Sequence, residues 1–398
     1  MIYVLFRYNG YCVRPGGWRN LLKALTSHKL KINLTEAKKM TKVDIKKLGF
    51  SAAWAKEADL YEGLYAGRVA AQSKDIYRVI SENGEIMAEV SGKLRFAAKS
   101  QVDFPAVGDF VMLDRTVNTN GNAVIHHVLS RKSAFIRKAA GTSLEEQIVA
   151  SNIDLLFICM SLNNDFNLRR LERYLAIGWN SGAVPLVVLT KADLCSDLAI
   201  KISEVESVCP GVDIVVTSAL QENSYSQIIQ YLKPGQTVAF IGSSGVGKST
   251  LINCLLAEDR LLTNGLRNDD KGRHTTTMRE LILLKNGAMV IDTPGMRELG
   301  LENADLTKTF TDIVQLASQC RFSDCTHTSE PGCAVRQALD DGRLSQERFL
   351  SYQKLQKEIK YDGLNSRQIE AVKMQEMFSE FAGVKNARKY VKKKNKRR

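Results

Sequence analysis

The spacing of apolar residues changes twice along the chain, and each change indicates a different kind of structure. Between residues 62 and 133, short runs alternate apolar with polar positions, and turns rich in Gly and Asn separate them. This alternation is typical of strands with one buried face. The predicted strands cover residues 67–71, 75–80, 86–90, 109–113 and 123–129. Five short strands indicate a small barrel of the OB type, a fold that often binds oligonucleotides.

From residue 150 onward, continuous apolar runs alternate with helical patterns. The runs predict buried strands over 153–160, 185–190, 213–217, 237–241 and 287–292. Helical spacing occurs over 168–177, 200–208 and 250–256. Strands that alternate with helices predict a parallel α/β sheet. Two more helices, over 334–339 and 346–359, follow without any intervening strand pattern.

Positive charge is concentrated at the two ends of the chain. Residues 1–61 contain 12 Lys and Arg against 4 Asp and Glu, and residues 381–398 contain 9 basic residues and no acid. The middle therefore carries −4 of the overall +13. Such ends favour a polyanion, and we expect a disordered tail that contacts RNA phosphates; a merely solubilising tail is the alternative. On the barrel, the candidate contacts are Arg68, Arg78, Lys93, Arg95 and Lys99.

The start of the chain and its cysteines limit the possible locations. No apolar run reaches about 18 residues, and the first residues become polar too early for a signal peptide. The 8 cysteines do not form a disulfide pattern, which favours a reducing cytoplasm. Residues 1–39 show little periodicity, whereas a helical pattern follows over 45–54, so Met40 is a candidate start. No heptads suggest a dimer, and we expect a monomer without a membrane partner.

A phosphate-binding loop lies between the strand at 237–241 and the helix at 250–256. It has the pattern G-x-x-x-x-G-K-[ST], in which glycines let the backbone surround phosphate oxygens. Lys248 is expected to reach the β- and γ-phosphates, and Ser249 to bind Mg²⁺. The predicted nucleotide-binding residues here are Gly242, Ser243, Ser244, Gly245, Val246, Gly247, Lys248, Ser249 and Thr250.

Two earlier strand ends carry residues that suit guanine. The first has Thr190, Lys191, Ala192 and Asp193, which resembles the motif Asn-Lys-x-Asp. An Asp carboxylate accepts hydrogen bonds from guanine N1–H and the 2-amino group, a pair that adenine does not offer. The next strand end has Ser218 and Ala219, which resembles the Ser-Ala motif that contacts guanine O6. Thr190 replaces the usual Asn and lacks its amide, which predicts a lower affinity for the base.

The residues expected to act on the γ-phosphate follow the loop. Asp292 and Gly295 form an Asp-x-x-Gly pattern after a strand, with Asp on Mg²⁺ through water and the Gly N–H on phosphate. Thr276, in a Gly-containing switch segment, is the candidate second Mg²⁺ ligand. No Gln follows Gly295, so His274 is the local candidate to orient water. The alternative is that His274 only packs within its loop. We therefore predict slow intrinsic hydrolysis, with Lys248 completing the catalytic set.

A cysteine-rich segment near residue 320 is predicted to hold one structural Zn²⁺ ion. Its spacing is Cys-x4-Cys-x-His-x5-Cys, which brings three thiolates and one imidazole within 14 residues. A Cys₃His set fills a tetrahedral zinc site and leaves no open position for catalysis. The ligands are Cys320, Cys325, His327 and Cys333. The remaining cysteines lack such neighbours and are interpreted as small apolar residues.

An ordinary GTPase has its phosphate-binding loop, switch Thr and Asp-x-x-Gly before its base-reading motifs, whereas here the base-reading residues come first, which is a circular permutation. With the barrel before them and the cysteine cluster after them, the motifs over 42–365 resemble the ribosome-small-subunit-dependent, circularly permuted GTPases of the RsgA/YjeQ type. The switch segment at 272–277 resembles that of the family as well. The resemblance implies late maturation of the small subunit, binding to 16S rRNA, and hydrolysis of GTP to GDP and phosphate that the subunit stimulates.

Three domains and two basic ends follow from this resemblance. We expect a basic extension with a short helix over 1–61, an OB-fold barrel over 62–133, a circularly permuted α/β P-loop GTPase domain over 134–301, a zinc-binding helical domain over 302–365 and a basic tail over 366–398. Two alternatives stay open. One is an RNA-binding module that GTP orders without hydrolysis. The other is a P-loop kinase or ATPase with an accidental Thr-Lys-x-Asp.

Overall fold

The computed structural model describes most of the chain after residue 41. The described residues are 42–118, 121–138, 146–218, 221, 224–261, 279–292, 304–361, 364 and 366–377. The chain divides into two compact units, Met1–Thr41 and Lys42–Arg398, and all described residues belong to the second. The candidate start at Met40 therefore lies outside the described residues.

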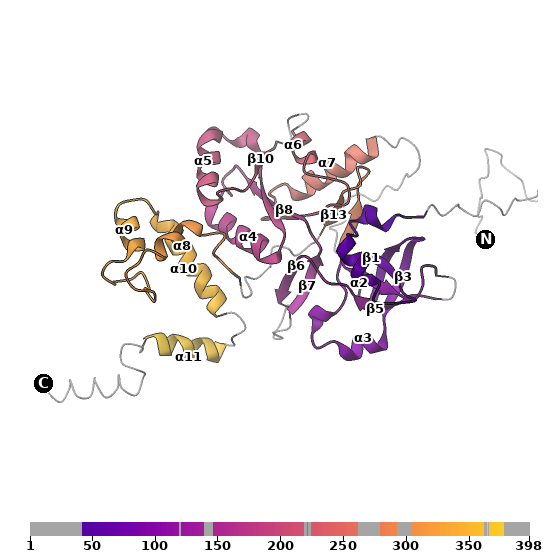
Figure 1. Cartoon of the computed structure of the whole chain (residues 1–398). Coiled ribbons are helices and arrows are strands. Elements are labelled where there is room, and N and C mark those ends of the chain that lie inside the picture. The colour runs from indigo at the N-terminus through magenta and orange to yellow at the C-terminus, as the bar shows by residue number, and fades with distance from the viewer. Residues whose placement is uncertain are drawn as a thin grey trace, which may run out of the picture. The chain divides into compact units, whose positions relative to one another are not determined.

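Five antiparallel and parallel pairings close a barrel after residue 64, which confirms the five predicted strands (Figure 1). The strands are β1 (Tyr65–Ser73), β2 (Ile76–Ser81), β3 (Gly84–Val90), β4 (Phe110–Leu113) and β5 (Ala123–Val128). They pair in the order β1-β2-β3-β5-β4, and β4 pairs back with β1. Alternate positions point inward, because successive side chains of a strand face opposite sides. The fully buried interior includes Val69, Val79, Ile86, Val111 and Ile125.

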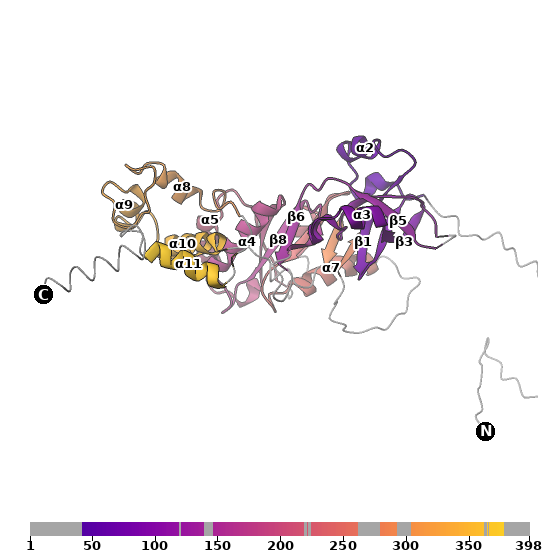
Figure 2. The same ribbon diagram turned by 90° about the horizontal axis from the view of Figure 1, so that it is seen from below.

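Two short helical segments connect β3 to β4 around the outside of the barrel. These segments are α3 (Gly92–Ala97) and the 3₁₀ turn η2 (Gln101–Asp103). The side chain of Ser91 accepts a hydrogen bond from the backbone N–H of Leu94 at 3.0 Å, which caps the start of α3. Helix α3 lies beside β5 in both views (Figures 1 and 2). Before the barrel, η1 (Ile45–Leu48) and α2 (Ala52–Ala58) replace the single short helix that the sequence predicts.

A parallel sheet forms the middle of the chain and confirms the predicted α/β pattern. Its parallel strands are β8 (Leu155–Ser161), β9 (Val184–Thr190), β10 (Ile214–Val216), β11 (Thr237–Ile241) and β13 (Met289–Asp292). They lie in the order β10-β9-β8-β11-β13. A sixth strand, β12 (Glu280–Leu283), pairs antiparallel with β13 and was not predicted. Ala71 of β1 pairs with Glu280, so barrel and sheet are continuous.

Helices on the two faces explain why these strands are apolar along most of their length. The helices are α4 (Leu168–Ser181), α5 (Leu198–Val208), α6 (Ser226–Ile229) and α7 (Lys248–Leu261). Leu156 and Ile158 belong to an apolar cluster with α4 residues, whereas Phe157 belongs to a second cluster with α7 residues. Phe157 packs edge-on against Phe240 of β11, with ring centroids 5.0 Å apart. Burial on both faces is typical of parallel sheets.

A two-stranded hairpin between the barrel and the sheet was not predicted. It consists of β6 (Ala134–Lys138) and β7 (Glu146–Ser151). The side chain of Asn152, just after β7, donates to the carbonyl of Gly108 at 3.1 Å and accepts from the backbone N–H of Lys132 at 2.9 Å. These bonds attach the hairpin to the barrel.

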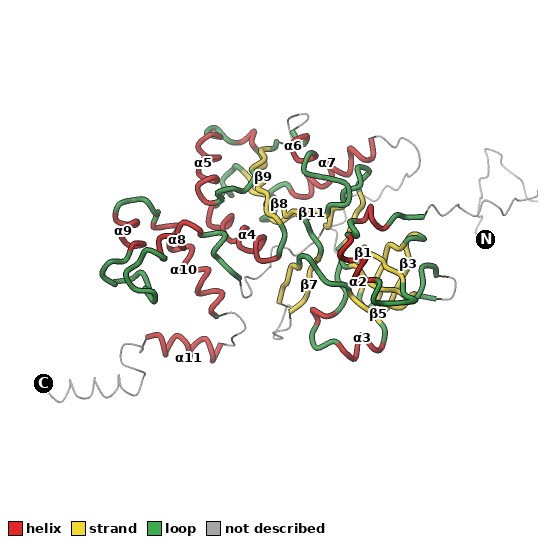
Figure 3. The backbone as a smooth tube through the Cα atoms, in the orientation of Figure 1, coloured by secondary structure: helices red, strands yellow, loops and turns green. Residues whose placement is uncertain are grey.

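The described part of the chain after residue 303 contains helices and loops without strands (Figure 3). The helices are α8 (Thr311–Ala317), α9 (Ala334–Asp340), α10 (Gln346–Lys360) and α11 (Ser366–Met377). The predicted helices match α9 and α10, and α8 was not predicted. The first residues of the expected basic tail, 366–377, form α11. Residues 378–398 lie outside the described residues.

Arg68, one of the residues expected to contact RNA, is instead buried between the barrel and the sheet. The side chain of Arg68 is only 1% exposed, and it connects the barrel to the sheet. It donates to the carbonyl oxygens of Leu48 at 2.5 Å and Gly108 at 3.2 Å, and to the hydroxyl of Thr237 at 2.7 Å. Desolvation lowers its pKa to about 10, and nearby carboxylates oppose that shift. Arg68 therefore cannot contact RNA, because its hydrogen-bond donors are used inside the protein.

Within the residues that the structure describes, no helix has both the length and the hydropathy that a membrane span requires.

Candidate functional site

The predicted phosphate loop connects the end of β11 to the start of α7. Gly242, Gly245 and Gly247 have φ angles of +153°, +72° and +103°. A Cβ atom on Gly242 would lie 2.4 Å from the carbonyl oxygen of Cys159, so no other residue fits there. The loop therefore depends on glycine at a position where two backbone segments approach closely. Buried Val246 anchors the loop in the core.

The Lys248 ammonium lies over this loop. Its Nζ atom donates to the carbonyl oxygens of Gly242 at 2.7 Å and Ser243 at 2.6 Å. Ser249 and Thr250, in the first turn of α7, are exposed. The start of a helix directs backbone N–H groups and the positive end of its dipole toward an anion. Loop, ammonium and hydroxyls together form a site that fits phosphate.

Asp165, which sequence reasoning missed, supports the loop from the end of β8. Its Oδ2 atom accepts a hydrogen bond from the Ser243 hydroxyl at 2.5 Å and from Arg170 Nη1 at 2.8 Å. Those two hydrogen bonds, the one from Arg170 first, lower the pKa of Asp165. A polar run at the carboxyl end of a parallel strand could have pointed to this residue, because ligands bind at that edge.

Thr190, at the end of β9, is bonded directly to the phosphate loop. Its side chain is buried, and its Oγ1 atom donates to the carbonyl oxygen of Val246 at 2.6 Å. It also lies 3.4 Å from the carbonyl oxygen of Met160. The hydroxyl thus joins the base-reading strand end to the phosphate loop. Thr190 lacks the side-chain amide of the Asn that usually occupies this position, which would reach further toward a base.

The two predicted base-reading segments lie side by side. The backbone N–H of Ala192 donates to the carbonyl of Thr217 at 3.1 Å, and the Ser218 hydroxyl donates to Asp193 Oδ1 at 2.5 Å. Lys191 has a φ angle of +57°, where the chain turns from β9 into the 3₁₀ turn η3 (Ala192–Leu194). The structure therefore brings Asp193 and Ser218 together on the side of the sheet that carries the phosphate loop.

Of the residues after the phosphate loop that are predicted to act on the γ-phosphate, only the backbone of Asp292 is described. Asp292 ends β13, directly after Ile291, whose partner on β11 is Ala239; this places the backbone of Asp292 near the start of the phosphate loop. The predicted site residues outside the described part of the chain are Ala219, His274, Thr276 and Gly295. Their roles stay predictions.

The four predicted metal ligands form one cluster. Their ligand atoms all lie within 4.8 Å of one another. Cys320 Sγ lies 3.9 Å from Cys333 Sγ and 3.6 Å from His327 Nδ1, and Cys333 Sγ lies 3.4 Å from the same nitrogen. Zn–S bonds of about 2.3 Å in a tetrahedron place sulfur atoms about 3.8 Å apart. The spacing of the donor atoms therefore fits a tetrahedral metal ion.

Backbone groups around the cluster favour thiolate and hold the loop. Burial opposes ionisation of Cys320, but hydrogen bonds from the backbone N–H groups of Val335 and Ala334 leave its pKa below the usual value. The carboxylate of Glu330 accepts from the backbone N–H groups of Thr326 at 2.8 Å and Thr328 at 2.9 Å. The loop that carries two of the four donors is thus ordered by its own hydrogen bonds.

An ion-pair network joins the cysteine-rich helices to α4 of the sheet. Arg348 of α10 donates to Glu172 of α4 at 2.8 Å, and Glu172 is fully buried. The same guanidinium makes a bidentate pair with Asp312 of α8, at 2.6 and 2.8 Å. Burial raises the pKa of Glu172, although hydrogen bonds and positive charges oppose the shift. Both α8 and α10 are therefore attached to the helix that also carries Arg170, the partner of Asp165.

A phosphate loop on a parallel sheet, with its base-reading segments earlier in the sequence, defines a circularly permuted G domain. Residues 128–302 match the RsgA GTPase family. The chain is 52% identical over 351 residues to the small ribosomal subunit biogenesis GTPase RsgA 2 of Lactiplantibacillus plantarum, covering 88% of this chain and 98% of that protein. It is 44% identical over 316 residues to RsgA of Methanosarcina acetivorans, covering 77% and 84%.

Solved structures agree with these sequence relatives. YjeQ from Thermotoga maritima matches with a TM-score of 0.56 and 28% identity, covering 74% of this chain and 98% of that one. YloQ, described as a circularly permuted GTPase, matches with a TM-score of 0.54 and 28% identity, covering 75% and 96%. The chain therefore belongs to the RsgA family of GTPases, and it is a GTP hydrolase.

Proposed function

We propose that this GTPase acts in late maturation of the small ribosomal subunit, where it binds 16S rRNA and is stimulated to hydrolyse GTP. The observation that carries the proposal is the combination of a permuted G domain with an OB-type barrel and a Cys₃His domain, in a chain that is 52% identical to a small ribosomal subunit biogenesis GTPase. The basic segments at 1–61 and 381–398 support an RNA partner, because clustered cations neutralise backbone phosphates.

The nucleotide is held by the site described above. The loop from Gly242 to Thr250 surrounds the phosphates, and Lys248 exchanges its two carbonyl partners for phosphate oxygens. Asp193 accepts two hydrogen bonds from the guanine edge, with Lys191 along the base plane and Ser218 and Ala219 beside it. Ser218 holds the Asp193 carboxylate in place at 2.5 Å, so the acceptor is oriented before the base arrives.

The residues for hydrolysis come from the loop and from the segments after it. Ser249 and Thr276 would hold Mg²⁺, with Asp292 contacting it through water, and the ion would neutralise charge that develops on the phosphates. The N–H of Gly295 contacts the γ-phosphate. His274 orients the attacking water, because no glutamine follows Gly295. The hydroxyl of Ser249 is exposed in the first turn of α7, which fits a ligand to Mg²⁺.

The Cys₃His cluster holds one structural zinc ion. The four donors lie within 4.8 Å of one another, and a Cys₃His set would leave no position for a substrate, so the ion would stabilise the helices around it and take no part in hydrolysis. Phe349 of α10 packs edge-on against His327, with ring centroids 6.4 Å apart. Metal binding therefore also orders the helix that carries Arg348.

We further infer that the protein is a cytoplasmic monomer with the domain boundaries predicted from the sequence. The first boundary falls before β1 and the second before the hairpin β6–β7. The third separates the G domain from the helical domain with the Cys₃His cluster. Size-exclusion chromatography with light scattering tests the monomer: a mass near 44.4 kDa agrees with it, and twice that mass contradicts it.

Steady-state hydrolysis tests the proposed function. GTP turnover would be measured alone, with purified small subunits and with large subunits, and ATP serves as the nucleotide control. We expect slow turnover alone and strong stimulation by the small subunit only. Equal stimulation by both subunits, or none by either, would refute the role at the small subunit. It would leave the assignment as a GTPase intact.

A further inference from the structure

The connection between β8 and α4 is ordered by its own side chains. The Ser161 hydroxyl donates to Asn163 Oδ1 at 2.8 Å, and the backbone N–H of Asp165 donates to the same oxygen at 3.1 Å. The side chain of Asn167 accepts from the backbone N–H of Arg170 at 3.0 Å, which caps the start of α4. The backbone of Asp165 is therefore held by contacts that do not involve its own carboxylate.

One carboxylate oxygen of Asp165 joins this connection to the phosphate loop. Its Oδ2 atom accepts from the Ser243 hydroxyl at 2.5 Å and from Arg170 Nη1 at 2.8 Å. Hydrogen bonds to an ionised acceptor are stronger than bonds between neutral groups. The side chain of Ser243 is thus fixed by a residue that belongs to none of the nucleotide-binding motifs.

Ser243 is held from two sides, and nucleotide binding removes one of them. Its hydroxyl is bonded to Asp165, and its carbonyl oxygen accepts from Lys248 Nζ at 2.6 Å. In the proposed nucleotide complex, Lys248 leaves this carbonyl for phosphate oxygens. The bond to Asp165 then continues to hold Ser243. Because backbone N–H groups of such a loop are its phosphate ligands, a fixed Ser243 also fixes the directions of its neighbours' N–H groups.

Arg170 balances the charge of Asp165 beside a site for anions. An unpaired carboxylate would repel the phosphates of a nucleotide, since like charges a few ångströms apart weaken binding. The ion pair between Asp165 and Arg170 has no net charge, and the two side chains are 41% and 28% exposed. Asp165 can therefore orient Ser243 strongly without adding a net negative charge to the phosphate site.

We propose that Asp165 is a positioning residue of the nucleotide site, which acts through the Ser243 hydroxyl to hold the phosphate loop in the shape that binds the phosphates. Arg170 orients the carboxylate and balances its charge. The inference rests on the proposed nucleotide site, but not on the proposed role at the small subunit. It assigns Asp165 an effect on phosphate binding that is independent of the base.

The affinity for GDP, measured by calorimetry on the full-length protein, tests this role. We expect Asp165→Ala and Ser243→Ala each to bind GDP about tenfold more weakly, because each loses a charge-assisted hydrogen bond. The double variant should bind no more weakly than either single variant, because both substitutions remove the same bond. Additive losses would overturn the proposal, as would wild-type affinity in Asp165→Ala. Ser243→Thr keeps the hydroxyl and should recover most of the affinity that Ser243→Ala loses.

Two readouts separate positioning of the loop from a general structural role. Inosine diphosphate lacks the 2-amino group of guanine, so the ratio of GDP to inosine diphosphate affinity reports base recognition. Asp165→Ala should keep the wild-type ratio. In intrinsic hydrolysis, the KM for GTP should rise about tenfold and kcat should change far less, because the loop binds the phosphates in the ground state and the transition state alike. A changed ratio, or a fall in kcat at constant KM, would overturn the proposal.

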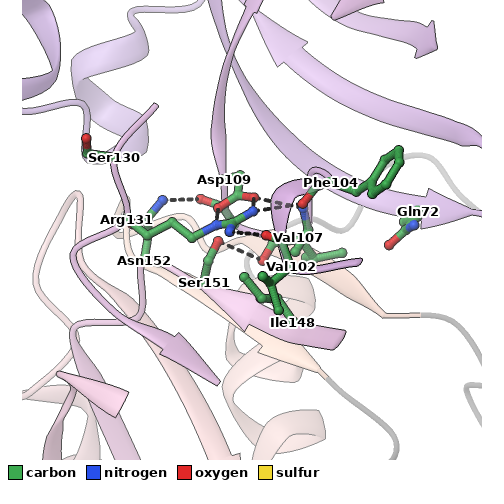
Figure 4. A network of polar contacts seen from close by, with 12 residues as sticks. Gln72, Val102, Phe104, Val107, Asp109, Ser130, Arg131, Ile148, Ser151 and Asn152 are labelled. Atoms are coloured by element: carbon green, nitrogen blue, oxygen red, sulfur yellow. Dashed lines mark hydrogen bonds and ion pairs between the residues drawn. The ribbon is translucent and has the colours of Figure 1, made fainter. Parts of the chain in front are cut away.

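Two control variants match Asp165→Ala in exposure and in loss of stability. Asp341→Ala removes a carboxylate that is 40% exposed and paired with Arg343, so GDP affinity should stay at the wild-type value. Arg131→Met breaks the pair with the fully buried Asp109, at 2.8 and 2.6 Å (Figure 4). It lowers stability without touching the phosphate loop, so the folded variant should bind GDP as wild type does. An equal loss of affinity in Arg131→Met would overturn the proposal, because instability would then explain both results.

Lys248→Ala separates a failure of this inference from a failure of the proposed nucleotide site. If Lys248→Ala binds GDP as tightly as wild type, the nucleotide lies elsewhere and both are overturned. If Lys248→Ala loses affinity and Asp165→Ala does not, the loop binds the nucleotide, and only the role of Asp165 is overturned.

Discussion

The ion pair between Arg348 and Glu172 should carry much of the attachment between the cysteine-rich helices and the G domain. Replacing Arg348 with Met keeps most of the side-chain volume but removes the charge. Glu172 is then left buried with Arg169, 2.6 Å away, as its remaining charged partner in the described network. The carbonyl of Thr309, which accepts from Arg348 at 3.0 Å, loses that donor.

The free-energy cost of Arg348→Met depends on how deeply each partner of Arg348 is buried. Breaking a buried ion pair typically costs about 3–5 kcal/mol, because the remaining charge stays desolvated. The second partner, Asp312, has a side chain that is 42% exposed, so water screens that pair and it adds about 1 kcal/mol or less. Arg169 still compensates part of the negative charge of Glu172, so the expected cost lies at the lower end of the range for a buried ion pair. We expect a loss of about 3 kcal/mol in the local stability of α8 and α10, or about a hundredfold in their opening equilibrium.

Hydrogen exchange followed by mass spectrometry measures that opening helix by helix. Peptides from α8 and α10 should exchange about a hundredfold faster in Arg348→Met, and barrel peptides should not change. Arg343→Met is the control, because its pair with Asp341 is exposed and its loss should leave exchange unchanged. In a Glu172→Gln background, Arg348→Met should cost clearly less than alone. Additive effects of the two substitutions would refute the reasoning.

Three more predictions follow from single contacts. Thr190→Val keeps the shape but leaves the carbonyl of Val246 without its 2.6 Å donor, so GTP affinity measured by calorimetry should fall about tenfold, while Thr190→Ser should stay near wild type. Gly242→Ala places a Cβ atom 2.4 Å from a carbonyl oxygen, so fluorescent GTP analogues should no longer bind; unchanged binding would contradict the loop geometry. Burial raises the pKa of Cys159 to about 12, so its alkylation by iodoacetamide in the folded protein should stay negligible from pH 7 to about 9, where ordinary thiols ionise. Labelling of that thiol that rises through about pH 8.5 would show that it is not buried.

The elements that the sequence predicts well are those with a strong local pattern. The barrel strands alternate over several residues, and the strands of the parallel sheet are apolar along most of their length because both faces are covered. The strand β12 and the hairpin β6–β7 were missed because they are short and mix polar with apolar positions, and β12 also pairs with β1, which is distant in sequence. Helix α8 is similarly short, and its partner Arg348 lies 36 residues away.

The residues of the candidate site also differ in whether the sequence alone could reveal them. Residues in a contiguous motif could be found by spacing alone, as with the phosphate loop and the cysteine cluster. Asp165 lies 78 residues before its partner Ser243, and no spacing rule connects them. Arg68 was wrongly predicted to contact RNA, because a cation on a strand is usually exposed to solvent. Its burial depends on tertiary packing, in which four separate segments of the chain accept hydrogen bonds from its guanidinium group.

The central claim is that this chain reads guanine through Asp193 and hydrolyses the nucleotide in response to the small subunit. The most direct test is hydrolysis of GTP and of xanthosine triphosphate by wild type and by Asp193→Asn, each with and without small subunits. Xanthine carries a carbonyl where guanine has its 2-amino group, so an Asn amide can donate to it. We predict that the subunit stimulates GTP hydrolysis by wild type and xanthosine triphosphate hydrolysis by the variant. A variant that still prefers GTP, with wild-type stimulation, would contradict the account.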